Sequence, residues 1–111
     1  MDLTGKCLSD FGQFLYDNYP NNLISENFGY SYGMFERDLE QLTYILPEQM
    51  TNAIIIDFFD SVGLNIMINK ERLSSEWMFV IHHHTLSSGL KNRNEATKFS
   101  IIKANEIYNK L

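Results

Sequence analysis

The chain has 111 residues, of which 44% are hydrophobic and 14% are aromatic, and its formal net charge is −5. This length is typical of a single domain, residues 1–111, and the longest aliphatic run, residues 53–56, is far too short for a membrane-spanning helix of about 20 residues. The single cysteine, Cys7, excludes an internal disulfide bond and a cysteine-based zinc site, and the acidic balance disfavours non-specific binding to duplex DNA.

The first predicted element is an amphipathic helix over residues 6–19. Its apolar side chains recur at three- and four-residue spacing, and Thr4 stands at the position of a helix cap. Cys7 lies on the apolar face, which predicts a small buried side chain. The next segment, residues 21–33, is rich in Asn, Ser and Gly and is predicted to be a loop.

Two more helices are predicted before the first strand. Residues 35–46 carry apolar side chains at helical spacing, and residues 47–62 begin with a proline and are followed by Gly63, a typical residue after a helix end. The isoleucines at 54–56 also suit a strand. We favour a helix and expect it to be the central, most buried helix of the fold. Its predicted face consists of Met50, Ile54, Phe58 and Ser61 or Val62, extended by Ile55 and Phe59.

The following segments alternate in the manner of strands. Residues 64–68 and 77–82 each place apolar side chains at every second position, and the polar residues 70–75 between them predict a turn of an antiparallel hairpin. Residues 85–91 are predicted to be a loop, with a third short strand around Leu86 as the alternative.

The last predicted element is a helix that is capped by Asn92 or Asn94. Its apolar stripe is predicted to contain Ile101, Ala104, Tyr108 and Leu111, with Lys98, Asn105 and Asn109 directed elsewhere. The fold class is therefore α+β, in which three N-terminal helices, an antiparallel hairpin and a C-terminal helix surround one core.

Two groups of residues are candidates for chemistry. If the second strand continues through His82, His83 and His84, two of the three rings share a face, but zinc catalysis needs three protein ligands, and no accompanying metal motif is present. Asp57 and Asp60 are neighbours on their helix, yet no nucleophile or glycine-rich loop accompanies them. We therefore expect no catalytic residue, no metal and no cofactor. A hydrolase or metal enzyme built on these residues is the third functional hypothesis, after the two that are given below.

The charges are divided unevenly along the chain. Residues 1–68 carry ten acidic and two basic side chains, a net −8, whereas residues 69–111 carry seven basic and four acidic side chains, a net +3. The acidic part favours a basic partner surface, with ordinary solvation as the alternative. The predicted partner-binding residues combine aromatic and acidic side chains: Phe28, Tyr30, Tyr32, Glu36, Asp38 and Glu40.

The basic C-terminal part supports an alternative function. A hairpin followed by a helix is part of the topology of double-stranded RNA-binding domains, and Lys91, Arg93 and Lys98 are the predicted contacts with nucleic acid. The alternative hypothesis is therefore a small RNA- or DNA-binding regulatory protein that uses the hairpin and the last helix.

Three segments resemble a group of small proteins encoded by phages and prophages. They are LTGKCLSDF at residues 3–11, LPEQMTNAIIIDFFDSVGLNI at 46–66 and EATKFSIIKANEIYNKL at 95–111. The resemblance covers helices and carries over no catalytic residue. It implies a phage accessory protein that acts in the cytoplasm of an infected or lysogenic bacterial host. The leading hypothesis is an anti-defence inhibitor, of the anti-CRISPR type, whose partner is a host defence protein or ribonucleoprotein with direct or indirect contact to RNA.

Overall fold

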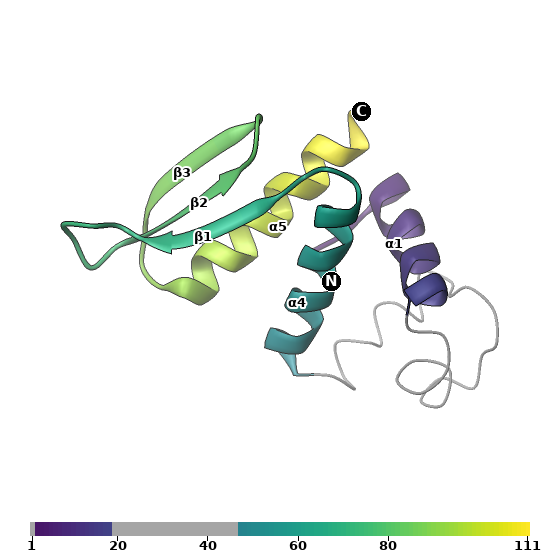
Figure 1. The fold of residues 1–111 in the computed structure, drawn as a ribbon, viewed down its shortest axis with the longest axis horizontal. Coiled ribbons are helices and arrows are strands. Elements are labelled where there is room, and N and C mark those ends of the chain that lie inside the picture. Colours follow the sequence, from purple (N-terminus) through teal and green to yellow (C-terminus); the bar gives the residue numbers. More distant parts are fainter. Residues whose placement is uncertain (1, 19–46) are drawn as a thin grey trace.

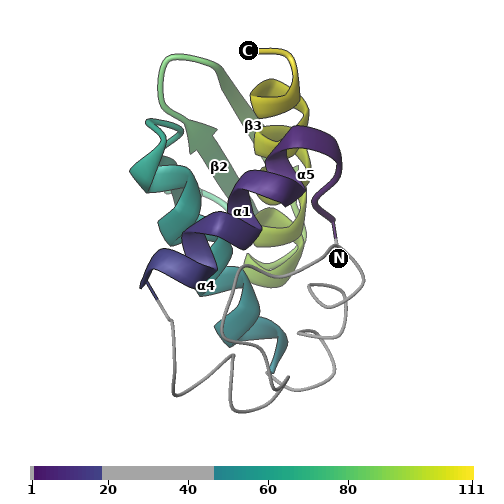
Figure 2. The ribbon, with the colours of Figure 1, turned by 90° about the vertical axis from the view of Figure 1, so that its right-hand side faces the viewer.

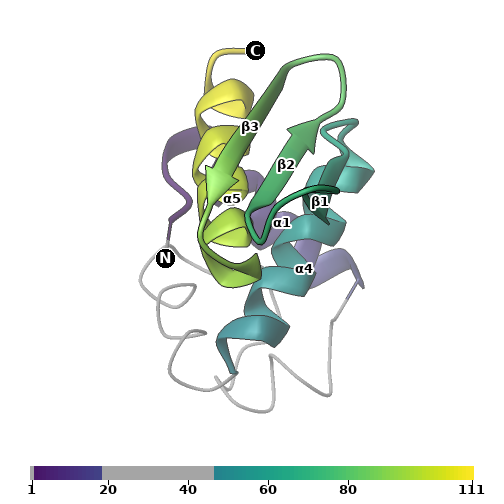
Figure 3. The same ribbon diagram turned by 90° about the vertical axis from the view of Figure 1, so that its left-hand side faces the viewer.

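The computed structural model describes residues 2–18 and 47–111, and these form three layers (Figures 1, 2 and 3). A three-stranded antiparallel sheet is the first layer, two helices that lie side by side, α4 and α5, are the second, and α1 crosses them as the third. The elements are α1 (Gly5–Asn18), α4 (Glu48–Ser61), β1 (Ile66–Lys70), β2 (Trp77–Ile81), β3 (Thr85–Leu90) and α5 (Arg93–Asn109).

The α+β class is confirmed, with a difference in the number of helices before the sheet. Two helices precede the sheet in the described part of the chain, whereas the sequence predicts three. The predicted loop at 21–33 and the predicted helix at 35–46 lie outside the described residues.

Helix α1 confirms the first predicted helix, but its N-terminal end is held by the other end of the chain. The side-chain Oδ1 of Asn109 accepts a hydrogen bond from the Cys7 N–H at 2.8 Å, and the Oδ1 of Asn105 accepts one from the Thr4 N–H at 2.9 Å. The sequence places Asn105 and Asn109 outside the apolar stripe of the last helix, and the structure directs both side chains to the start of α1. Both amides serve α1 because its first turn meets the last turns of α5, where the first N–H groups of α1 need acceptors.

Helix α4 confirms the helical interpretation of residues 54–56. It begins after Pro47 and is followed by Gly63, whose φ of +85° suits a residue without a Cβ atom. The predicted face is partly wrong, because Met50 and Val62 are exposed. The buried side chains of α4 are Thr51, Ile54, Ile55, Phe58 and Phe59.

The sheet has the order β1-β2-β3, and both pairs are antiparallel. Ile66 pairs with Ile81 and Ile68 pairs with Phe79, so that these side chains share the face that is directed towards α5. Residues 85–90 form a full strand, β3, which corrects the loop prediction in favour of its alternative. The pairing of Leu86 with Val80 supplies ladder hydrogen bonds that compensate for the weak strand propensity of this Ser- and Gly-containing segment.

The central helix is α5, not α4 as the sequence suggests. Helix α5 contacts all three strands, α1 and α4. Its buried Ala96, Ser100 and Ala104 have small side chains, which allow neighbouring elements to approach closely. Asn92 caps α5 by accepting a hydrogen bond from the Glu95 N–H at 2.8 Å, as predicted, whereas Leu111 is exposed and does not belong to the apolar stripe.

Candidate partner-binding site

The three histidines form an exposed turn. His82, His83 and His84 lie in the turn between β2 and β3, not on a strand, and all three are exposed. The turn is tight because His83 has a φ of 67° and the His84 N–H donates to the Ile81 carbonyl at 2.9 Å. Within residues 2–18 and 47–111, no three side chains of the metal-binding types converge on one point.

The two aspartates of α4 are also surface residues. Asp57 and Asp60 are exposed, and the Oδ1 of Asp60 accepts a hydrogen bond from the Asn65 side chain at 3.2 Å. Asp60 thus supports the connection between α4 and β1.

A hollow of about 240 Å³ lies between the C-terminal parts of α1, α4 and α5. We call it the acidic hollow, because its charged lining residues are Asp10 and Asp17. The other lining residues are Gln13, Phe14, Asn18, Phe58, Ser61, Val62 and Tyr108.

Aromatic rings form one part of its lining. The ring centroids of Phe14 and Phe58 are 5.6 Å apart, and those of Phe58 and Tyr108 are also 5.6 Å apart. Such rings present negative π faces that attract cations. One cation is already nearby, since the Lys6 Nζ lies 5.3 Å from the centroid of the Tyr108 ring.

The carboxylates add negative charge to these rings. The Tyr108 hydroxyl donates to the Asp10 Oδ2 at 2.5 Å, and this bond, followed by burial and the Asp10 charge, raises the pKa of Tyr108 to about 12. Asp17 is exposed and accepts a hydrogen bond from the Gln13 side chain at 3.0 Å. The C-terminal ends of α1 and α4 carry the negative ends of their helix dipoles. The acidic hollow therefore suits the positively charged end of an arginine or lysine side chain.

A second hollow, of about 260 Å³, lies between the first turns of α4 and α5. We call it the helix-start hollow. Arg93 is its charged lining residue, and the others are Gln49, Asn52, Ala53, Ile56, Asn94 and Thr97. The N-terminal ends of two helices and a guanidinium give it positive potential, opposite to that of the acidic hollow.

The predicted site residues are only partly within the described chain. The aromatic and acidic set at 28, 30, 32, 36, 38 and 40 lies outside it. Lys91, Arg93 and Lys98 are exposed near the start of α5, and the Arg93 guanidinium lies 4.9 Å from the centroid of the Trp77 ring. The acidic hollow is not among the sites predicted from the sequence, although the spacing of Asp10, Phe14 and Asp17 places them on one face of α1.

Comparison with known proteins does not assign the chain to a family: no protein family, no curated protein and no solved structure matches it. Within the residues that the structure describes, no helix is both long and apolar enough to cross a membrane.

Proposed function

We propose that this protein is a phage-encoded anti-defence inhibitor of the anti-CRISPR type. It binds a host nucleic-acid-guided nuclease in a fixed ratio and without catalysis. The class of partner rests on the resemblance of residues 3–11, 46–66 and 95–111 to phage and prophage proteins. The chemistry of the contact rests on the acidic hollow, which is the observation that carries the proposal.

The acidic hollow matches the chemistry of a nucleic-acid-binding surface. Guided nucleases hold their guide and target in channels that are lined with Arg and Lys. An arginine that enters the hollow gains a carboxylate partner in Asp17 and a contact with the ring of Phe14, which is partly exposed above the buried Phe58. An arginine held in this way is no longer available to a phosphate, so the inhibitor competes with nucleic acid.

The predicted aromatic and acidic residues, which lie outside the described part of the chain, are a further part of the partner contact in this proposal. Phe28, Tyr30 and Tyr32 supply apolar anchors, and Glu36, Asp38 and Glu40 add negative charge. Complementary charge of this kind accelerates association and selects basic partners.

The test is a cleavage assay with purified, guide-loaded nucleases of the host. We expect the wild-type protein to stop cleavage by one of them at a fixed molar ratio. The Asp17→Lys variant should need at least about a tenfold higher concentration than the wild type to inhibit cleavage equally, because it places a like charge against the basic partner. This exchange does not threaten the fold, since Asp17 is exposed in the last turn of α1, where a cation is favoured.

The matched control is Glu76→Lys, which makes the same change in charge at an exposed position beside the β1–β2 turn. The Glu76→Lys variant should inhibit cleavage to the same extent as the wild type. Equal loss of inhibition in both variants would show that only net charge matters, and failure of the wild type to inhibit any guided nuclease of the host would refute the proposed function.

The alternative function, a small RNA- or DNA-binding regulatory protein, is favoured by one observation. The helix-start hollow combines Arg93 with two helix N-termini, and Lys91 and Lys98 lie nearby in sequence. Binding of a labelled RNA duplex should then weaken steeply with salt, and Arg93→Gln should reduce the salt slope by about 1. Absence of binding at low salt would exclude this alternative.

A further inference from the structure

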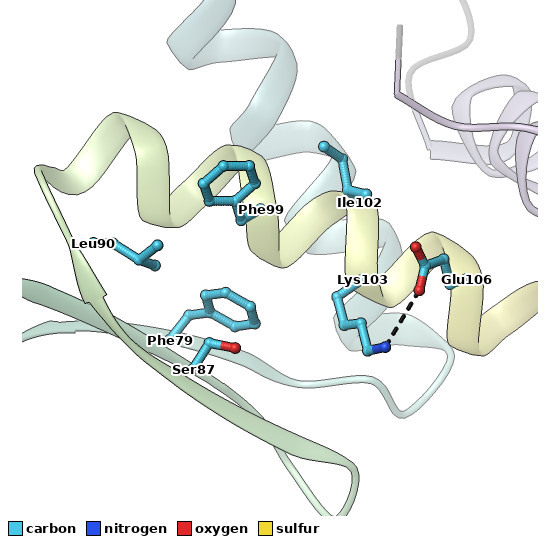
Figure 4. Close-up of a pocket in the computed structure, with 7 residues that line it drawn as sticks. All are labelled: Phe79, Ser87, Leu90, Phe99, Ile102, Lys103 and Glu106. Atoms are coloured by element: carbon cyan, nitrogen blue, oxygen red, sulfur yellow. Dashed lines mark hydrogen bonds and ion pairs between the residues drawn. The ribbon is translucent and has the colours of Figure 1, made fainter.

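The strands β2 and β3 and the side of α5 line a third hollow, of about 220 Å³ (Figure 4). Four of its lining side chains are apolar, namely Phe79, Leu90, Phe99 and Ile102, and the others are Ser87, Lys103 and Glu106. Phe99 is 43% exposed, which is unusual for an aromatic side chain on a helix that packs against a sheet.

The strand beside this hollow has an edge without charged residues or proline. In the sheet order β1-β2-β3, β3 has one edge that no described strand covers. Natural edge strands usually carry charged residues or proline, which prevent pairing with another chain. The sequence of β3, TLSSGL, contains neither. Its irregular pairing opposite Trp77 and Phe79, beside Gly89 with a φ of +77°, limits the regular part to Thr85–Ser87.

An exposed apolar side chain also marks the opposite face of the sheet at this edge. Met67 pairs with Val80, and Val80 pairs with Leu86, so the three form a row across the outer face. Leu86 is 60% exposed at the end of that row. One contact along the edge of β3 would therefore cover Leu86 on the outer face and Phe99 on the inner face.

We infer that this edge binds a second copy of the same chain, with β3 pairing antiparallel to β3 across a two-fold axis. In such a contact each residue meets residues of the same surface, so a charged strand would meet its own charge. The six residues of β3 carry no charge. The charged residues at the rim, Lys103 and Glu106, have opposite signs and are paired at 3.3 Å, so two copies of the rim bring together a neutral set (Figure 4).

The same charge pattern argues against a foreign peptide as the occupant. A charged peptide gains no complementary charge from β3, whereas the row of Met67, Val80 and Leu86 is continued without interruption by the same row of a second copy. This inference does not depend on the proposed inhibitor function, because the acidic hollow and this hollow have no lining residue in common.

The test is sedimentation equilibrium of the full chain between about 1 and 500 μM. We expect a concentration-dependent shift from the chain mass of 13.0 kDa to twice that mass. The dimer should tighten with added salt, because each copy carries a net charge of −5 and salt screens the repulsion. Amide hydrogens of β3 should exchange more slowly at the higher concentrations.

Leu86→Lys should raise the dimer dissociation constant at least about tenfold, since it places like charges on both sides of the two-fold axis. Met67→Lys is the matched control, because Met67 is 54% exposed on the same face but on the opposite edge strand, and it should dimerise as the wild type does. If Leu86→Lys fails to fold by circular dichroism, Ser88→Lys at an exposed polar position of β3 replaces it.

Three results would overturn the inference. They are a monomer at every concentration, a dimer that survives Leu86→Lys, and a dimer that Met67→Lys weakens equally. A monomer at every concentration would mean that a different molecule binds at the edge of β3. A dimer that Met67→Lys weakens equally would mean that the whole outer face of the sheet forms the contact.

Discussion

Replacement of Asn105 by alanine should destabilise the fold, although the residue lies on a helix where alanine is favoured. The Oδ1 of Asn105 accepts a hydrogen bond from the Thr4 N–H at 2.9 Å, and its Nδ2 donates to the Thr4 Oγ1 at 3.0 Å. These bonds join residues that are 101 positions apart in the chain. They attach the start of α1 to α5, so their loss weakens the contact between two layers.

The expected change in the free energy of unfolding combines the loss of the hydrogen bond at Thr4 with the gain in helix propensity at position 105. Removal of the acceptor leaves the Thr4 N–H without its partner, which costs about 1–3 kcal/mol when such a group is buried. Thr4 itself is exposed, so water replaces part of the loss and the lower half of this range applies. Alanine returns roughly 0.5 kcal/mol of helix propensity. We therefore expect the free energy of unfolding to fall by about 1 kcal/mol.

The assay is urea unfolding followed by circular dichroism, at a pH where the wild type is fully folded. Asn94→Ala is the control, because Asn94 is exposed in the first turn of the same helix, and it should change the free energy of unfolding by no more than about 0.5 kcal/mol. Equal stability of Asn105→Ala and the wild type would show that the contact between Asn105 and Thr4 contributes nothing to stability.

Three further predictions concern individual side chains. Burial, with a smaller contribution from Asp10, raises the pKa of Cys7 to about 12. The Cys7 thiol should therefore resist a thiol reagent at pH 8 in the folded protein and react after unfolding in urea. Rapid reaction in the native state would contradict the burial of Cys7. The Tyr108 pKa of about 12 lies above its ordinary value of 10, so the stability that this shift represents is complete below pH 10 and is lost as the pH rises towards 12. An ultraviolet titration should show that one tyrosine ionises late. The Asp10→Asn variant should ionise that tyrosine at a lower pH. Arg93→Ala should lower the free energy of unfolding by about 0.5–1 kcal/mol and change Trp77 fluorescence, because the guanidinium lies over the indole ring; an unchanged emission spectrum would count against that contact.

The sequence predicts best where one local pattern decides the structure. Helix α4 has a proline at its start, a glycine after its end and apolar residues between them, and the hairpin of β1 and β2 has clear alternation. Strand β3 is harder to recognise, because its small polar residues acquire strand structure through pairing with β2. The histidine turn has the same origin: pairing ends at Ile81 and Thr85, which leaves His82, His83 and His84 to reverse the chain.

The candidate site is predictable only in part, since it combines residues from distant segments. The face of α1 with Asp10 and Asp17 can be recognised from helical spacing alone. Phe58 and Tyr108 join it only because α1 crosses both α4 and α5, with its buried side chains in the common core and its start bonded to Asn105. No local pattern reports a contact between the two ends of the chain.

The acidic hollow is tested as a binding site for a basic side chain by an NMR titration of the ¹⁵N-labelled protein with a tri-arginine peptide as the probe. We expect the largest shift changes at the amides of Asp10, Asp17 and Val62, around the acidic hollow, and weaker binding of the probe by Asp17→Asn. A tri-glutamate peptide should leave these amides unchanged. Shift changes that are spread over the surface, or equal for both peptides, would contradict the claim that this hollow receives a basic side chain of the partner.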